Sequence, residues 1–108
     1  PTRLRGLAWI FTSETQFKRT ELRKQFESLS TQIIRLKGIL KTGNEWQKFD
    51  WSEQQCTFQD IAWRQDSRIE CLIHPEMAMC DRNKERALIH TIETAIFNCI
   101  HQPLTENT

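Results

Sequence analysis

The sequence predicts an α/β (α+β) domain built as a two-layer sandwich, with a mixed sheet of about five strands and both helices on one face. Segments that alternate between apolar and polar residues predict strands, and two segments with apolar residues three or four apart predict helices. Taken in order, these segments give the element sequence β-α-β-β-β-β-α. Since each helix has one apolar stripe, one face of the sheet can accommodate both.

The chain opens with an apolar strand and a helix. Residues 4–12 (LRGLAWIFT) are almost all apolar, which is typical of a strand buried on both faces and predicts a central place in the sheet. Residues 18–30 predict a helix, because apolar side chains recur at helical spacing in Leu22, Phe26 and Leu29.

Residues 32–41 predict a strand with two different faces. Ile34, Leu36, Gly38 and Leu40 point one way, and the other face carries Ile33, Arg35, Lys37, Ile39 and Lys41. Short links between strand, helix and strand predict a βαβ unit, in which the two strands are parallel and joined by a right-handed crossover.

The second half of the chain predicts three more strands and a closing helix. The strands are expected at residues 46–51, 56–63 and 68–74. The helix is expected to begin near residues 81–83 and to end near residue 100, before a polar tail at residues 103–108. Residues 1–102 are thus expected to form a single domain.

Composition excludes several classes of protein. With 108 residues and 38% hydrophobic residues, the chain has enough apolar sequence for one modest core. No apolar run approaches the roughly 20 residues of a membrane helix, and the start lacks a signal-peptide pattern, so we expect a cytoplasmic protein. The net charge of +1 gives the whole molecule no strong attraction to nucleic acid or acidic lipid.

Motifs for nucleotide binding, hydrolysis and metal binding are missing. The sequence contains no phosphate-binding loop, no GxSxG and no HExxH pattern. Cysteines occur without a CxxC pair, so we expect reduced thiols at Cys56, Cys71, Cys80 and Cys99. Metal-like spacing occurs in Cys71–His74 and Cys99–His101, but both cysteines lie on apolar faces, so we expect core residues and no metal site.

The basic side of the strand at residues 32–41 is the more informative feature. Arg35, Lys37 and Lys41 are expected to lie beside Trp and Phe side chains of the following strands. One interpretation is a stacking surface for a ligand or single-stranded nucleic acid, as part of an independent binding module. The near-neutral net charge favours the other interpretation, a face that is solvated or covered by a protein partner.

Three short motifs, in order, resemble one known family. Ile34–Leu40 (IRLKGIL) resembles the R-x-K-G-hydrophobic strand of the C-terminal domain of CobW-type GTPases. Residues 66–73 (DSRIECLI) look like that domain's D-x-R-x-E-hydrophobic last strand, and Phe17 and Leu22 match the start of its first helix. A closing helix follows in both, so the resemblance covers about residues 4–100.

The resemblance implies a function for the parent protein and a supporting role for this chain. Members of the family are cytoplasmic GTPases of the metal-chaperone or metallocentre-assembly type, linked to cobalamin synthesis and to zinc, cobalt or nickel handling. Their GTP-binding loop and metal-binding cysteine motif belong to an N-terminal domain that is absent from this chain. GTP, magnesium and a transition metal would therefore be cofactors of the parent protein, and none is expected here.

By the same resemblance, the chain is a regulatory or interaction domain without catalysis of its own. Its expected partners are its own N-terminal GTPase domain, a client metalloprotein or a second subunit, with no membrane and no nucleic acid among them. The candidate interaction residues are Arg35, Lys37, Lys41, Arg68 and Glu70. Arg35 and Glu70 are expected to pair across neighbouring strands.

Overall fold

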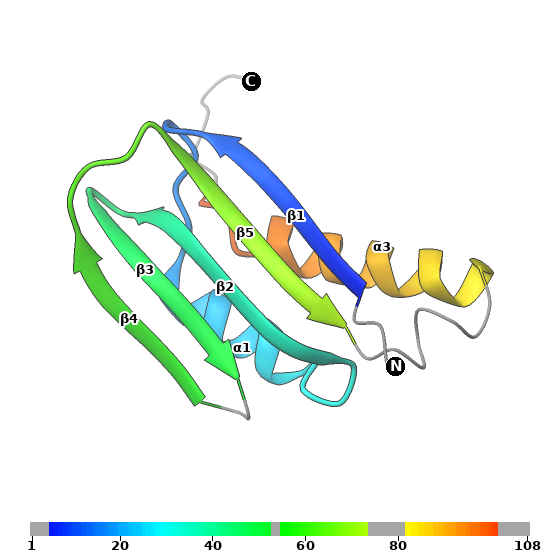
Figure 1. Cartoon of the computed structure of the whole chain (residues 1–108). Coiled ribbons are helices and arrows are strands. Elements are labelled where there is room, and N and C mark those ends of the chain that lie inside the picture. Colours follow the sequence, from blue (N-terminus) through cyan, green and yellow to red (C-terminus); the bar gives the residue numbers. More distant parts are fainter. Residues whose placement is uncertain (1–4, 53–54, 74–81, 102–108) are drawn as a thin grey trace, which may run out of the picture.

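The computed structural model describes residues 5–52, 55–73 and 82–101, and it shows a two-layer α+β domain (Figure 1). A five-stranded sheet forms one layer, and two helices form the other. The fold class and the order of the elements are as predicted. The elements are β1 (Arg5–Thr12), α1 (Arg19–Glu27), β2 (Ile33–Thr42), β3 (Glu45–Ser52), β4 (Gln55–Ile61), β5 (Asp66–Ile73) and α3 (Arg82–Asn98).

The sheet is antiparallel throughout, so the predicted mixed sheet is wrong in this respect. Its strand order is β1-β5-β2-β3-β4, and every neighbouring pair is antiparallel. β1 and β2 do run in the same direction, but β5 lies between them and pairs with both. After the β3–β4 hairpin, the chain continues into β5, which lies between β1 and β2 in the sheet.

β1 is an edge strand, and the expectation of a central strand buried on both faces was wrong. Its side chains are at most half-buried, and Ile10 is 66% exposed. An uninterrupted apolar run is typical of a central strand, yet only one face of β1 lies against the helices. The other face remains open to solvent.

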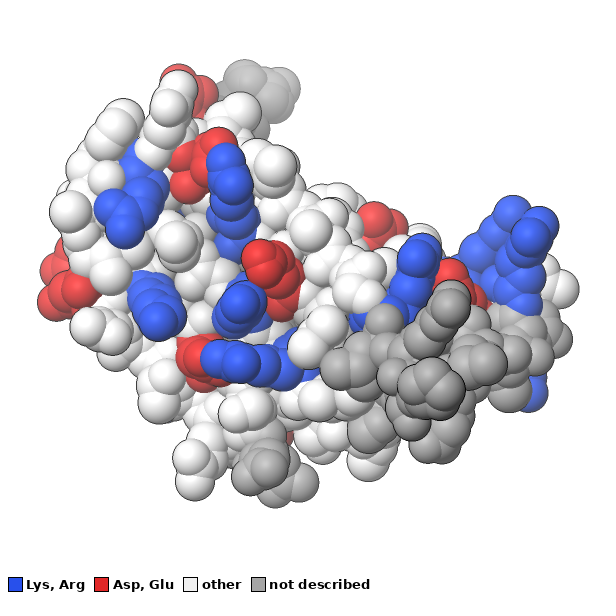
Figure 2. Space-filling view, viewed as in Figure 1, with Lys and Arg blue, Asp and Glu red and all other residues white. Residues whose placement is uncertain are grey.

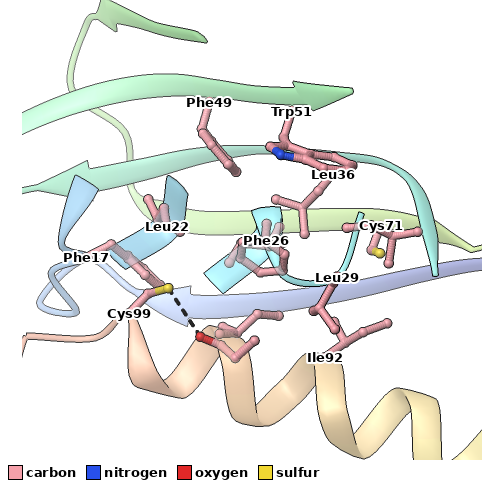
Figure 3. Packing of buried hydrophobic residues seen from close by; sticks show 14 of the residues in the cluster. Phe17, Leu22, Phe26, Leu29, Leu36, Phe49, Trp51, Cys71, Ile92 and Cys99 are labelled. Atoms are coloured by element: carbon pink, nitrogen blue, oxygen red, sulfur yellow. Dashed lines mark hydrogen bonds between the residues drawn. The ribbon is translucent and has the colours of Figure 1, made fainter. Parts of the chain in front are cut away.

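The core lies between the sheet and the two helices, which cover the same face (Figures 1 and 3). α1 contributes Leu22 and Phe26, while α3 contributes Ile92 and Ile96, all fully buried. The sheet meets them with large side chains, of which Leu36, Leu40, Phe49, Trp51, Ile69, Cys71 and Ile73 are buried. This agrees with the predicted apolar stripes of both helices.

A bulge at the start of β2 changes which isoleucine enters the core. The pairing of β2 with β5 shifts between Ile33 and Arg35, so Ile33 lies opposite Ile73 and is 2% exposed. Ile34 is only half-buried, whereas strict alternation predicted the reverse. From Leu36 onward the alternation holds, and the basic residues keep their predicted face.

The two helices are joined to each other and to the sheet at one end. The backbone amide of Phe17 donates to the Lys41 carbonyl at 2.8 Å, and that of Lys18 donates to the Cys99 carbonyl at 2.7 Å. Lys18 precedes α1 without providing a side-chain cap, so these tertiary bonds fix the start of the helix. Within the described residues, no helix is both long and apolar enough to cross a membrane.

Candidate interaction surface

The sheet face that points away from the helices, called the open face below, gathers most of the charged side chains of the sheet (Figure 2). Alternation along the strands places these residues there, and the strand registers align them across the sheet. The charged members are Arg35, Lys37, Lys41, Lys48, Asp50, Asp66, Arg68 and Glu70. Five are basic and three are acidic, so the open face has a positive excess.

All five predicted interaction residues lie on this face. Arg35, Lys37 and Lys41 come from β2, and Arg68 and Glu70 come from its neighbour β5. The structure brings them together because Lys37 lies directly opposite Glu70 in the ladder, two residues from the Arg68 position. All are exposed except Lys41, which is half-buried.

Arg35 pairs with Asp50 of β3, and the predicted pair with Glu70 is wrong. Its Nη2 donates to Asp50 Oδ2 at 2.7 Å, and its Nε donates to Oδ1 at 3.3 Å. This hydrogen bonding lowers the pKa of the Asp50 carboxyl, and it raises the pKa of the Arg35 guanidinium. The two-point contact fixes the guanidinium plane on the surface.

Glu70 instead pairs with Lys37, and Arg68 pairs with Asp66 of its own strand. Lys37 Nζ lies 3.9 Å from Glu70 Oε2, and Arg68 Nε donates to Asp66 Oδ1 at 3.0 Å. The open face therefore presents charges that are partly compensated within the sheet. Such charges are solvent-accessible and can exchange their partners for those of a docking protein.

Two lysines of the open face form no direct ion pair in the described part of the chain, although Lys48 contributes to lowering the pKa of the Asp50 carboxyl. Neither Lys41 nor Lys48 has a carboxylate within ion-pair distance. They lie on the adjacent strands β2 and β3, where Lys48 faces Ile39 and Lys41 faces Trp46. The lysines of the open face that form no direct ion pair thus lie on these two strands.

An apolar hollow of about 350 Å³ lies on the open face between β1, β5 and β2. Gly6, Ala8 and Leu72 line it with little side-chain bulk, and charged residues stand at its side, namely Arg35, Lys37 and Glu70. An apolar patch within a charged surround is the usual anatomy of a protein–protein contact.

Fewer aromatic side chains reach this face than predicted. Phe49, Trp51 and Phe58 point to the helix side, where they join or contact the core. On the open side Trp46 is 6% exposed, packed edge-on against Trp63 at 6.5 Å between ring centroids. Trp63 is 69% exposed, but a row of exposed rings for base stacking is absent from the described strands.

The described cysteines behave as core residues. Cys71 and Cys99 are buried, and burial raises the pKa of each thiol to about 12, so both are protonated at neutral pH. Cys99 Sγ donates to the Ala95 carbonyl at 3.2 Å (Figure 3). Among the described residues no group of three or more His, Cys, Asp or Glu is placed to hold a metal, and Cys80 and His74 lie outside them.

Comparison with known proteins decides the family. The family model described as the cobalamin synthesis protein cobW C-terminal domain matches residues 7–89. The chain belongs to this family. The expected resemblance is thereby confirmed over most of its length. A comparison with curated proteins gave no match.

Two solved structures share the fold of this CobW C-terminal domain. Both are of the Zn(II)-bound YjiA GTPase, one of them a triple mutant and the other from E. coli. The triple mutant has a TM-score of 0.58 and 10% identity over 89% of this chain; the second has 0.51 and 9% over 82%. In each case the chain spans 29% of the length of the solved protein.

The motifs that carried the resemblance now have a structural explanation. The R-x-K-G residues lie on β2 and the D-x-R-x-E residues on β5, and these strands are neighbours in the centre of the sheet. Gly38 is needed for close approach, because a Cβ there would lie 2.6 Å from the Arg68 carbonyl oxygen. The motif charges are the side chains that alternate outward from the same two strands.

The sequence-based choice of residues missed the acidic partners Asp50 and Asp66 and the neighbouring lysine Lys48. The alternation of residues 46–51 already placed Lys48 and Asp50 on one side, opposite Phe49 and Trp51. This alternation could have identified Lys48 and Asp50 as members of the open face. Asp66 begins the DSRIECLI motif, but it precedes the strand that was expected at residues 68–74, so alternation along that strand did not place it.

Proposed function

We propose that this CobW C-terminal domain is the regulatory and interaction domain of a cytoplasmic CobW-like GTPase involved in metal delivery or metallocofactor assembly of the cobalamin type. Family membership supports the parent function. The open face supports the role of the domain, because a sheet face with paired charges, two lysines outside direct ion pairs and an apolar hollow fits a protein partner. The partner is the GTPase domain of the parent protein, with a client metalloprotein or second subunit as the alternatives.

The nucleic-acid alternative loses its main support in the structure. It depended on aromatic rings beside the basic residues, and the rings of Phe49, Trp51 and Phe58 lie on the helix side. A basic surface without exposed stacking partners is a weak platform for single strands.

The 108-residue chain is expected to neither bind nor hydrolyse GTP. It has three glycines and no GxxxxGK[ST] loop, and that loop supplies the backbone amides and the lysine that hold the phosphates. Isothermal titration of the chain with GTP and Mg²⁺ tests this. Saturable binding in the micromolar range would contradict it.

Replacing Arg35 and Lys37 with Glu is expected to leave the domain folded and to weaken its binding to a CobW-type GTPase domain by at least about tenfold. Both side chains are exposed, so the substitution changes surface charge and spares the core. Binding to the immobilised chain is measured by interferometry, and folding by circular dichroism.

A matched control is available on the helix layer. Lys24→Glu with Arg86→Glu makes the same change in net charge at exposed positions on α1 and α3. Binding should remain at the wild-type level in this control. Equal weakening by both double variants would show a general charge effect and contradict a docking role for the open face.

A further inference from the structure

The outer edge of β1 is unpaired in the described structure and lacks the usual protection of an edge strand. Its ladder with β5 runs from Arg5 to Thr12 without a bulge, and the described residues contain no strand on its other side. Alternate backbone N–H and C=O groups along this edge therefore have no strand partner among the described residues. Residues 6–12 (GLAWIFT) include no charged residue and no proline, the two features that normally prevent edge-to-edge pairing.

The opposite edge of the sheet is protected, which makes β1 unusual within its own domain. Phe58 of β4 is covered on the helix side by Arg19 and Arg23 of α1, whose guanidinium groups both lie 5.8 Å from its ring centroid. The other side chains of β4 are mostly polar: Gln55, Thr57, Gln59 and Asp60.

Apolar side chains on both faces of β1 are incompletely covered. On the helix side Leu7, Trp9 and Phe11 are only half-buried, and on the open side Ile10 is 66% exposed. Figure 1 shows that α3 extends past β1, beyond the edge of the sheet. An added strand would therefore have a helix beside it and would complete the burial of the three large side chains.

We propose that β1 pairs antiparallel with β1 of a second copy of this chain, forming a continuous sheet across a two-fold axis. The two ends of the strand carry opposite charges. Arg5 stands at its start, where its Nη2 lies 3.5 Å from Glu85 Oε1 of the same copy, and Glu14 follows two residues after its end. Antiparallel pairing brings each arginine near the glutamate of the other copy, and parallel pairing would place like charges together. This charge arrangement favours a second copy over an unrelated strand.

The register that centres Trp9 on the axis is the best fit. It places Leu7 opposite Phe11 of the other copy on the helix side, and Ala8 opposite Ile10 on the open side. Directly opposite residues of an antiparallel pair share a face, so in this register the contacts from Leu7 to Phe11 are apolar against apolar. The two-fold contact is self-complementary, as in most homodimers. The contact adjoins the open face at Ala8 and Ile10. It uses none of the charged residues proposed for docking, so the inference does not rest on the proposed function.

One eight-residue strand and one overhanging helix from each copy make a small interface, so the dimer should be weak and depend on concentration. Sedimentation equilibrium of the 108-residue chain, from about 1 μM to about 1 mM, is the test. The mass should rise from the 12.9 kDa of one chain toward twice that value. A chain that remains monomeric over this range would overturn the proposal.

Two single variants locate the contact. Position 10 lies opposite Arg68 and position 8 opposite Glu70 within one copy. In Ile10→Glu and Ala8→Lys the new charge therefore faces an opposite charge, which is compatible with the folded monomer. Each variant should weaken dimerisation by at least about tenfold by placing a charge against an apolar strand. A mixture of the two should regain dimers, because Lys at position 8 then faces Glu at position 10.

Gln59→Glu on β4 is the matched control, since it also adds one negative charge opposite a basic residue, here Lys48, on an edge strand. It should dimerise like the wild type, as should the Arg35→Glu, Lys37→Glu double variant. Equal effects of Ile10→Glu and Gln59→Glu would overturn the proposal. Circular dichroism checks the fold, and if the Ile10 variant unfolds, the Ala8 variant carries the same test.

Discussion

Replacing Phe49 with alanine is expected to lower the free energy of unfolding by about 3–5 kcal/mol. The ring is fully buried on β3, and it lies 6.5 Å from the ring of Phe26 and 5.1 Å from that of Phe58, measured between centroids. Its loss leaves a cavity where α1 meets the sheet. Urea unfolding followed by tryptophan fluorescence measures the change.

Phe97→Ala is the matched control for this variant. The Phe97 side chain is 54% exposed on α3 and lies outside the core, so its removal should change stability by about 0.5 kcal/mol or less. If the two variants lose similar stability, the core described between the sheet and the helices is wrong.

Gly38→Ala is expected to destabilise the domain by about 1–3 kcal/mol, although alanine normally suits a strand better than glycine. The new Cβ would lie 2.6 Å from the Arg68 carbonyl oxygen and 3.5 Å from Ile69, so β2 and β5 would have to separate. Thermal unfolding measures the effect, at roughly 4–8 °C per kcal/mol for a domain of this size.

The chain offers the same substitution at a position without this constraint. A Cβ on Gly6 would have only Leu72 Cδ2 within reach, at an ordinary 3.7 Å. Gly6→Ala should therefore be neutral or stabilise by about 0.5–1 kcal/mol. An equal loss of stability at both positions would refute the close approach of the central strands.

Local patterns along the chain predicted the elements and much of the core. The alternation of Leu36, Lys37 and Leu40 correctly assigned the two faces of β2, and the stripe of Leu22 and Phe26 correctly oriented α1. Both patterns are local, because a side chain's direction follows from its position along its own strand or helix.

The strand order and the ion pairs could not be predicted in the same way. Nothing in residues 4–12 shows that β5 separates β1 from β2, since that depends on a pairing between segments about 60 residues apart. The bulge next to Ile33 likewise depends on β5. Because β2 lies between β5 and β3, Arg35 can pair with a carboxylate on either strand. It pairs with Asp50 on β3, at 2.7 Å from its guanidinium.

We propose the open face as the docking surface for the GTPase domain of a CobW-type protein. The most direct measurement is an NMR titration of the isotope-labelled chain with that GTPase domain. We expect the resonances of Arg35, Lys37, Arg68 and Glu70 to shift together, while those of exposed residues on α1 and α3 remain in place. Shifts confined to the helices, or saturated binding without any change on β2 and β5, would contradict the account.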